Sequence, residues 1–194
     1  HVCAIKGNFD DAQSGVKKIF TDNAVKGKLS ENNMLFSSAN SINWGRLLPQ
    51  IVYYVSAYCD LLAQGSIEIG DRVNFCVPTG NFGNILACYY AQKMGLPVGK
   101  LICASNANNV LTDFIRTGRY DRNRPFFTTT SPSMDILISS NLERVLYDMT
   151  GSDEEVRGYM QSLSDTGAYQ VSETVLERIR ENFVSGYCDD ARTL

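Results

Sequence analysis

The sequence predicts an α/β fold, in which helices cover a parallel sheet. Short apolar runs alternate with helix-like patterns through the first half of the chain, and alternation at that spacing is typical of parallel strands joined by helices. The runs are short and mainly apolar, which suits strands buried on both faces. A length of 194 residues with 44% hydrophobic and 20% charged residues is enough for one packed domain. Beyond about residue 130 the pattern is mainly helical.

In the N-terminal third, apolar spacing and breaker residues set the expected elements. Pro49 is expected to kink the longest helical pattern or to lie in its first turns. The predicted elements are a strand over 2–6, a helix opening at Asn8 or Asp10, a loop over 23–33, a short strand over 34–36 and a helix over about 42–64.

The remaining elements follow from the same criteria. Pro78 ends one apolar run, and Gly95 with Pro97 closes the helix that follows it. The acidic residues 153–155 favour the first turn of a helix, where carboxylates complement the helix dipole. The predicted strands are 73–77 and 101–104, and the predicted helices are 84–94, 109–116, 140–149, 153–164 and 173–184.

Charge, cysteine and histidine content exclude several classes of function. The 18 basic and 21 acidic residues leave a net charge of −3, which argues against a nucleic-acid binder held by bulk charge. No apolar run is long enough to predict a membrane-spanning helix. The single histidine, His1, argues against a Ser-His-Asp or Cys-His hydrolase. The six cysteines form no CxxC pair, so no metal site is expected. Four of them are predicted to be reduced core residues of a cytoplasmic protein: Cys59, Cys76, Cys88 and Cys103.

The most informative motif is the glycine loop Val77–Asn84, with the sequence VPTGNFGN, between a predicted strand and a predicted helix. Gly80 and Gly83 allow positive φ and a close approach of the backbone to a ligand. Free N–H groups of such a turn, together with the helix dipole, form an anion site. The loop matches neither GxGxxG nor a Walker loop. On these grounds alone it is either a phosphate site or a capped turn without a ligand.

Five segments together resemble one enzyme family. The glycine loop, IKGNFDDAQ (5–13), and segments 37–54, 101–118 and 128–146 are similar to threonine synthase, a fold-type II enzyme family that uses pyridoxal phosphate. The resemblance implies a three-layer αβα fold like that of the tryptophan synthase β chain. It also implies that residues 1–30 end the family's small domain, and that 31–194 form part of the large cofactor-binding domain. The chain is expected to be truncated at both ends.

The resemblance implies conversion of O-phosphohomoserine and water to threonine and phosphate. Gly80, Asn81, Phe82, Gly83 and Asn84 would cradle the cofactor phosphate. The family's Schiff-base lysine lies upstream of the matching segments, and none of the seven lysines here stands in a similar motif. No catalytic residue is therefore assigned. The isolated chain is predicted to be inactive without the N- and C-terminal segments of the same enzyme.

Three further groups of residues have open alternatives. Asn43 and Arg46 are candidates for the substrate phosphate, Arg46 through its planar guanidinium; alternatively Asn40, Ser41 or Asn43 caps a helix. Asn106 is a candidate cofactor neighbour, with helix capping by Asn108 or Asn109 as the favoured alternative. The segment 131–135 is either a ligand loop or a turn.

Two other functions remain as alternatives. One is another fold-type II enzyme, a serine or threonine dehydratase or a cysteine synthase, although the sequences TGNFGN and SINWGR argue against these. The other is a non-catalytic module that binds a phosphorylated ligand. Neither a nucleic acid nor a membrane is an expected partner.

Overall fold

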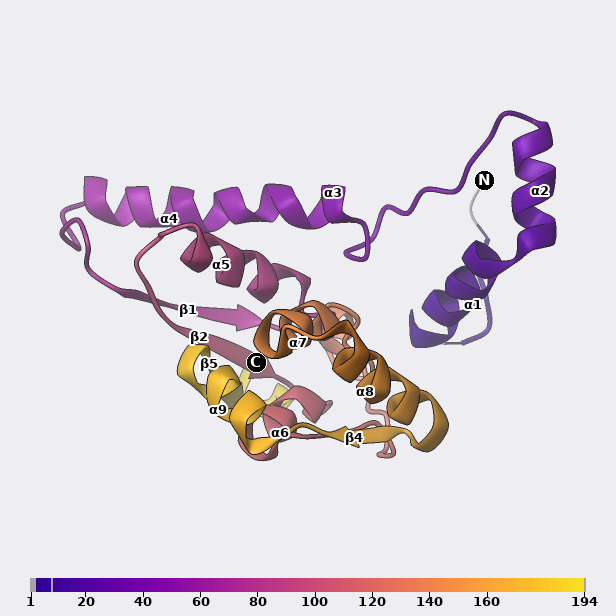
Figure 1. Cartoon of the computed structure of the whole chain (residues 1–194). Helices are drawn as coiled ribbons and strands as arrows, with labels where there is room; N and C mark the ends of the chain where they lie inside the picture. Colours follow the sequence, from indigo (N-terminus) through magenta and orange to yellow (C-terminus); the bar gives the residue numbers. More distant parts are fainter. Residues whose placement is uncertain (1–2, 8, 194) are drawn as a thin grey trace.

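The computed structural model describes residues 3–7 and 9–193, and a parallel three-stranded sheet lies at its centre (Figure 1). The strands are β1 (Val73–Pro78), β2 (Val98–Ser105) and β5 (Phe183–Tyr187), in the order β1-β2-β5. Both pairings are parallel, with Val77 opposite Cys103 and Cys103 opposite Ser185. The predicted α/β class is therefore confirmed.

Three helices pack on one face of this sheet: α5 (Gly83–Lys93), α6 (Val110–Thr117) and α9 (Glu173–Asn182). The order β1-β2-β5 follows the chain across the sheet from one edge to the other. Right-handed crossovers between strands in this order place the connecting helices on the same side of the sheet. Alternate strand residues on that side are buried: Val77, Leu101, Cys103 and Phe183. Their neighbours on the other side are exposed: Asn74, Cys76, Lys100 and Val184. Within the described residues, the helical layer therefore covers one face.

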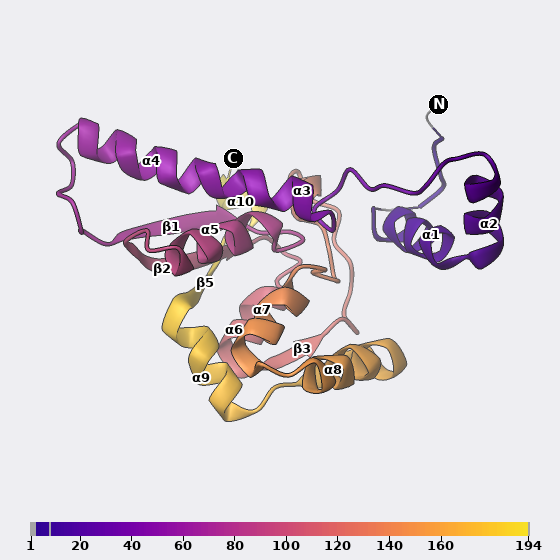
Figure 2. The ribbon, with the colours of Figure 1, turned by 45° about the horizontal axis from the view of Figure 1, so that its top comes forward.

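The long N-terminal helix is divided by its proline, as predicted. It consists of α3 (Trp44–Leu47), a 3-10 turn over Leu48–Gln50 that contains Pro49, and α4 (Ile51–Ala63). Figure 2 shows α4 running above α5 and β1. Tyr54 of α4 meets Phe75 of β1 edge to face at 5.1 Å, and this contact seats α4 on the buried side of the sheet.

The second half contains the predicted helices and three strands that were not predicted. The predicted helices are α7 (Leu142–Thr150), α8 (Asp153–Thr166) and α9. The short α10 (Asp190–Thr193) and a 3-10 turn over Pro132–Met134 were not predicted. The helix predicted over 173–184 stops at Asn182, because the chain turns there into β5. The short strands β3 (Arg119–Asp121) and β4 (Ala168–Gln170) pair antiparallel, and the rings of Tyr120 and Tyr169 stack 5.2 Å apart across them.

The first helix, α1 (Phe9–Thr21), is confirmed, but other N-terminal predictions are wrong. Residues 23–33 form a helix, α2 (Asn23–Glu31), and not a loop, because Asp22 caps it by accepting N–H groups of Ala24 and Val25. Residues 34–36 and 3–6 form no strand, since no described strand pairs with them. Val2 and Asn8 lie outside the described residues. Figure 1 shows an extended segment joining α2 to the α/β body, and Lys17 of α1 lines a cavity together with Tyr120 and Ser139 of that body.

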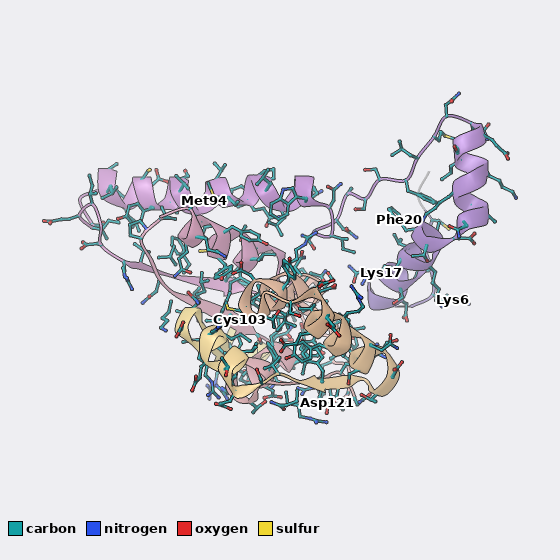
Figure 3. All side chains as sticks on the ribbon, in the orientation of Figure 1. Lys6, Lys17, Phe20, Met94, Cys103 and Asp121 are labelled. Atoms are coloured by element: carbon teal, nitrogen blue, oxygen red, sulfur yellow. The ribbon has the colours of Figure 1, made fainter. Side chains whose placement is uncertain are left out.

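The cysteine predictions are half right. Cys88 and Cys103 are fully buried, and Cys103 lies inside the body in Figure 3. Cys59 and Cys76 are exposed, because one lies on the outer side of α4 and the other on the open face of the sheet. All six thiols are free. No helix of the described residues has the length and apolarity needed to span a membrane.

Thiol labelling of the native chain tests this arrangement. Burial raises the pKa of Cys88 to about 12 and that of Cys103 to about 11, so both carry far less of the reactive thiolate at neutral pH than an exposed thiol. We expect a thiol reagent to modify Cys59 and Cys76 quickly, and Cys88 and Cys103 only after denaturation, as measured by peptide mass spectrometry. Equal rates at all four positions would contradict the fold.

Candidate functional site

The glycine loop lies where β1 ends and α5 begins, at the C-terminal edge of the sheet. Such edges of parallel sheets are where ligands bind. The loop lines a cavity of about 660 Å³. The other walls come from Ser41 and Gln50, from the segment 130–134, and from Thr193.

The backbone N–H groups of this loop are free to bind a ligand. The N–H of Thr79 donates to the carbonyl of Ala104 at 2.9 Å and completes the strand pairing. From Gly80 to Ile85, no backbone N–H donates to an acceptor in the described part of the chain. These groups include the first turn of α5, which has no side-chain cap. A cluster of unpaired N–H groups at a helix N-terminus is the donor set that a phosphate requires.

The carbonyl groups of the same loop are already bonded. Ser139 donates its hydroxyl to the Gly80 oxygen at 3.0 Å, and Asn141 donates its backbone N–H and side-chain amide to the Asn81 oxygen at 3.1 and 3.0 Å. The Tyr54 hydroxyl donates to the backbone and side-chain oxygens of Asn84. The acceptors of the turn are thus engaged, while its donors are left unpaired.

The predicted reason for the glycines needs a correction. The positive φ falls on Phe82, at 61°, and neither Gly80 nor Gly83 has one. A left-handed conformation costs an ordinary residue about 1–2 kcal/mol. Burial of the Phe82 ring against Phe183, with centroids 5.4 Å apart, offsets this cost by about 2–3 kcal/mol.

The two glycines are needed for close packing. A Cβ atom on Gly80 would lie 2.5 Å from the carbonyl oxygen of Ser133, and one on Gly83 would lie 3.0 Å from the Cβ of Ser41. The close approach that the sequence predicted is therefore an approach of neighbouring loops, which form the walls of the cavity.

A buried carboxylate fixes the facing loop. Asp135 is 4% exposed and accepts hydrogen bonds from the backbone and hydroxyl of Thr129 and from the side chains of Asn106 and Asn108. Burial acts to raise the pKa of Asp135, but these four hydrogen bonds outweigh it and hold the pKa below its ordinary value. The segment 131–135 is therefore a turn anchored by Asp135, and Ser131, Ser133 and Met134 of it line the cavity. Binding of a ligand by this segment stays a prediction.

The predicted capping by Asn108 or Asn109 is wrong. Asn108 bonds across to Phe127 and Asp135, and Asn109 accepts from the Arg124 guanidinium, so neither side chain caps α6. Asn106 lies in the same buried network and is not among the cavity-lining residues. These partners lie 15 to 29 residues away, which is why local sequence could not indicate them.

The candidate substrate residues lie beside the cavity and outside its lining. Asn43 caps α3 by accepting the N–H of Gly45 at 2.8 Å, and donates to Ser38. Arg46 is exposed on the same helix. Two cavity-lining side chains from this region, Ser41 and Gln50, were not predicted as ligand-binding residues.

All seven lysines lie within the described residues, and none lines the cavity. Lys93 pairs with Asp148, and the Lys100 amine donates to the carbonyls of Arg180 and Glu181. Lys6 is exposed. Within the described residues, this cavity is therefore lined by backbone N–H groups that could bind a phosphate, and by no lysine amine.

Fold and site together define an α/β protein in which a glycine turn at the edge of a parallel sheet leaves its backbone N–H groups unpaired within the described residues. No protein-family profile matches the chain. It is 49% identical over 193 residues to human threonine synthase-like 1, covering 98% of this chain and 26% of that protein. It is 40% identical over 192 residues to threonine synthase of Saccharomyces cerevisiae, covering 94% of this chain and 36% of that protein.

Solved structures give the same result. A crystal structure of threonine synthase from Brucella melitensis with pyridoxal phosphate bound superposes with a TM-score of 0.81 at 44% identity, covering 98% of this chain and 39% of that one. The resemblance to threonine synthases and the fold-type II class are thus confirmed. The chain spans between about a quarter and two fifths of the length of these relatives.

Alanine substitutions test the packing of the loop. Gly80→Ala is expected to lower the free energy of unfolding by about 1–3 kcal/mol, because backbone atoms of Ser133 obstruct the new methyl group. Gly158→Ala, on α8 with open space around it, is the matched control and should raise stability by about 0.5–1 kcal/mol. Urea denaturation measures both, and equal effects would contradict the described contact.

Asp135→Asn tests the buried network. The amide presents donors where the carboxylate accepted, so we expect a loss of about 1–3 kcal/mol in urea denaturation at pH 7. The carboxylate's contribution exists above its unfolded pKa of about 3.9 and is lost as pH falls through the lower folded pKa. The difference from wild type should therefore shrink below about pH 4. An effect no larger than that of exposed Asp153→Asn, or one independent of pH, would refute the network.

Proposed function

We propose that this chain forms the phosphate-holding part of the cofactor site of a pyridoxal-phosphate-dependent threonine synthase. The enzyme would convert O-phosphohomoserine and water to threonine and phosphate. The observation that carries the proposal is the run of unpaired N–H groups from Gly80 to Ile85 facing a cavity. Identity of 44% to a threonine synthase solved with pyridoxal phosphate supports the same cofactor here.

In this proposal, Gly80, Asn81, Phe82, Gly83 and Asn84 bind the cofactor phosphate mainly through backbone N–H groups. The helix dipole of α5 adds to the attraction for a doubly charged group. When bound, pyridoxal phosphate supplies an electron sink that lets protons leave Cα and Cβ of the substrate. Ser41 and the segment 130–134 form walls of the cavity beside the loop.

The exposed side chain of Arg46 is proposed to bind the substrate phosphate. A guanidinium can bind a phosphate through two parallel hydrogen bonds. Asn43 would act with it by fixing the N-terminus of α3, since its side chain caps that helix. Ser41 and Gln50 flank these positions in sequence and reach the cavity, so α3 lies next to the proposed cofactor site.

We infer that the amine that binds the cofactor comes from outside these 194 residues, because no lysine lines the cavity. Residues 1–30 would then end the small domain and 31–194 form part of the large domain, with α1 and α2 joined to the body by an extended segment in Figure 1. Segments of the longer enzyme would cover the exposed face that carries Cys76 and Val184, since parallel sheets are normally buried on both faces. The exposed free thiols suit a reducing cytoplasm.

Titration of the purified chain with inorganic phosphate tests the proposal. We expect progressive ¹⁵N–¹H shifts at the amides of residues 80–85 at millimolar phosphate, and none with chloride at equal ionic strength. The same preparation, supplied with pyridoxal phosphate and O-phosphohomoserine, should form no threonine. Unmoved loop amides would overturn the phosphate site. Threonine formation would overturn the inference that the amine lies elsewhere. Binding without any activity in the full-length enzyme would favour a non-catalytic phospholigand module.

A further inference from the structure

Asn141 stands at the N-cap position of α7 but does not cap that helix. An asparagine in this position normally accepts an N–H group of the first helical turn. Here the side chain makes no capping bond. It is 1% exposed, and its amide points to the glycine loop, where it donates to the Asn81 oxygen at 3.0 Å. The helix gives up a local hydrogen bond in favour of one 60 residues away.

That bond determines where a donor of the loop points. In a trans peptide unit the C=O and N–H groups lie in one plane and point in opposite directions. The Asn81 carbonyl belongs to the same unit as the Phe82 N–H. Because Asn141 holds this carbonyl with two hydrogen bonds, the Phe82 N–H is directed the opposite way.

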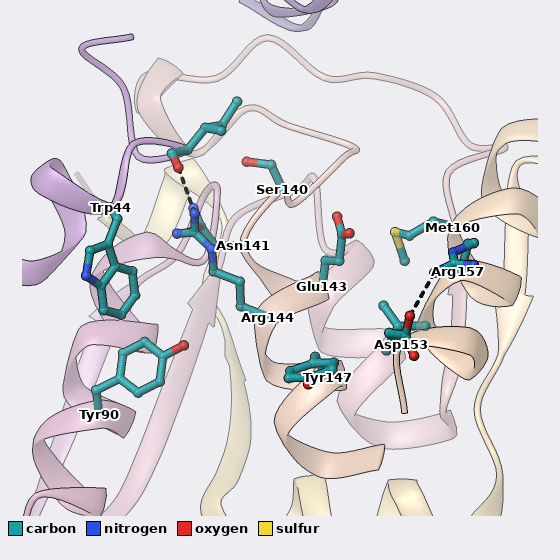
Figure 4. Close-up of a pocket in the computed structure, with 12 residues that line it drawn as sticks. Trp44, Tyr90, Ser140, Asn141, Glu143, Arg144, Tyr147, Asp153, Arg157 and Met160 are labelled. Carbon is teal, nitrogen blue, oxygen red and sulfur yellow. Dashed lines mark hydrogen bonds and ion pairs between the residues drawn. The ribbon is translucent and has the colours of Figure 1, made fainter. Parts of the chain in front are cut away.

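Arg144 holds Asn141 in this orientation. Its guanidinium donates to the Asn141 side-chain oxygen at 2.8 Å and to the Ile42 carbonyl at 2.7 Å. The same guanidinium lies over the Trp44 ring, 5.7 Å from its centroid. Figure 4 shows Arg144 extending between Trp44 and Asn141 at the edge of a second cavity, of about 680 Å³.

We propose that Asn141 and Arg144 are positioning residues that orient the Phe82 N–H for the phosphate and tie the glycine loop to the segment 42–44. The inference rests on the proposed phosphate site. Asn141 and Arg144 of the α7 region orient the N–H donors of the loop from the side of the turn opposite the ligand. Arg144 also contacts Ile42 and Trp44, and it thereby fixes the start of α3, the helix that carries Arg46.

Phosphate titration of Asn141→Ala is the first test. The substitution removes the side-chain amide and leaves only the backbone N–H of residue 141 to hold the Asn81 carbonyl. The peptide is then held less firmly, and we expect the phosphate Kd to rise about tenfold, with the largest change in bound shift at Phe82. Asn109→Ala is the matched control, because Asn109 also stands at a helix N-cap position without capping and accepts from an arginine at 3.0 Å. It does not contact the glycine loop, so its Kd should stay within about twofold of wild type.

Arg144→Lys tests whether Arg144 affects phosphate binding through its hydrogen bond to Asn141 (the relay) or directly through its charge. Lysine keeps the charge but lacks the fork that reaches both acceptors, so we expect the phosphate Kd to rise about threefold. In the Asn141→Ala background the same change should have no further effect, because the arginine acts through Asn141. An undiminished effect there, or an Asn141→Ala Kd equal to that of Asn109→Ala, would overturn the relay. If Asn141→Ala does not fold, Arg144→Lys decides alone, and an unchanged Kd refutes the inference. Loss of phosphate shifts in the wild type itself would instead refute the phosphate site.

Discussion

The direction of the peptide groups in one βα turn is the constraint on which the rest of the site depends. Ser139 and Asn141 hold the carbonyls of Gly80 and Asn81, and the donors of the turn are consequently left for a ligand. In this turn Phe82 has a left-handed conformation, and its ring is buried against Phe183 of the sheet. Burial of this ring in the hydrophobic core therefore offsets the backbone strain at Phe82.

The facing wall of the cavity is held by polar groups. The buried carboxylate of Asp135 accepts hydrogen bonds from Asn106 and Asn108, which follow β2, and from Thr129. These bonds hold the 130–134 loop opposite the glycine turn. Gly80 fits against Ser133 with no space for a side chain. The two walls are thus fixed independently of any ligand, and a preformed site loses little conformational freedom on binding.

Local patterns were sufficient for the elements around the glycine turn and insufficient elsewhere. Two glycines between an apolar run and a helical pattern located β1, the turn and α5, because the signals lie within a few residues. The strand β5 was missed because it follows α9 without a breaker residue. The helix α2 was missed because its polar sequence has no apolar face, and its cap, Asp22, lies one residue before the polar stretch. The roles of Asn141 and Asp135 depend on partners distant in sequence, which periodicity does not report.

Amide hydrogen exchange of the ligand-free chain, followed by NMR, tests the central claim most directly. The N–H groups of residues 80–85 should exchange rapidly without phosphate and slow when phosphate is added. The Thr79 N–H, bonded to Ala104, should be protected in both states. Strong protection of the loop amides before any anion is present would mean that these donors already have partners within the fold, and the account of the turn as a phosphate site would be wrong.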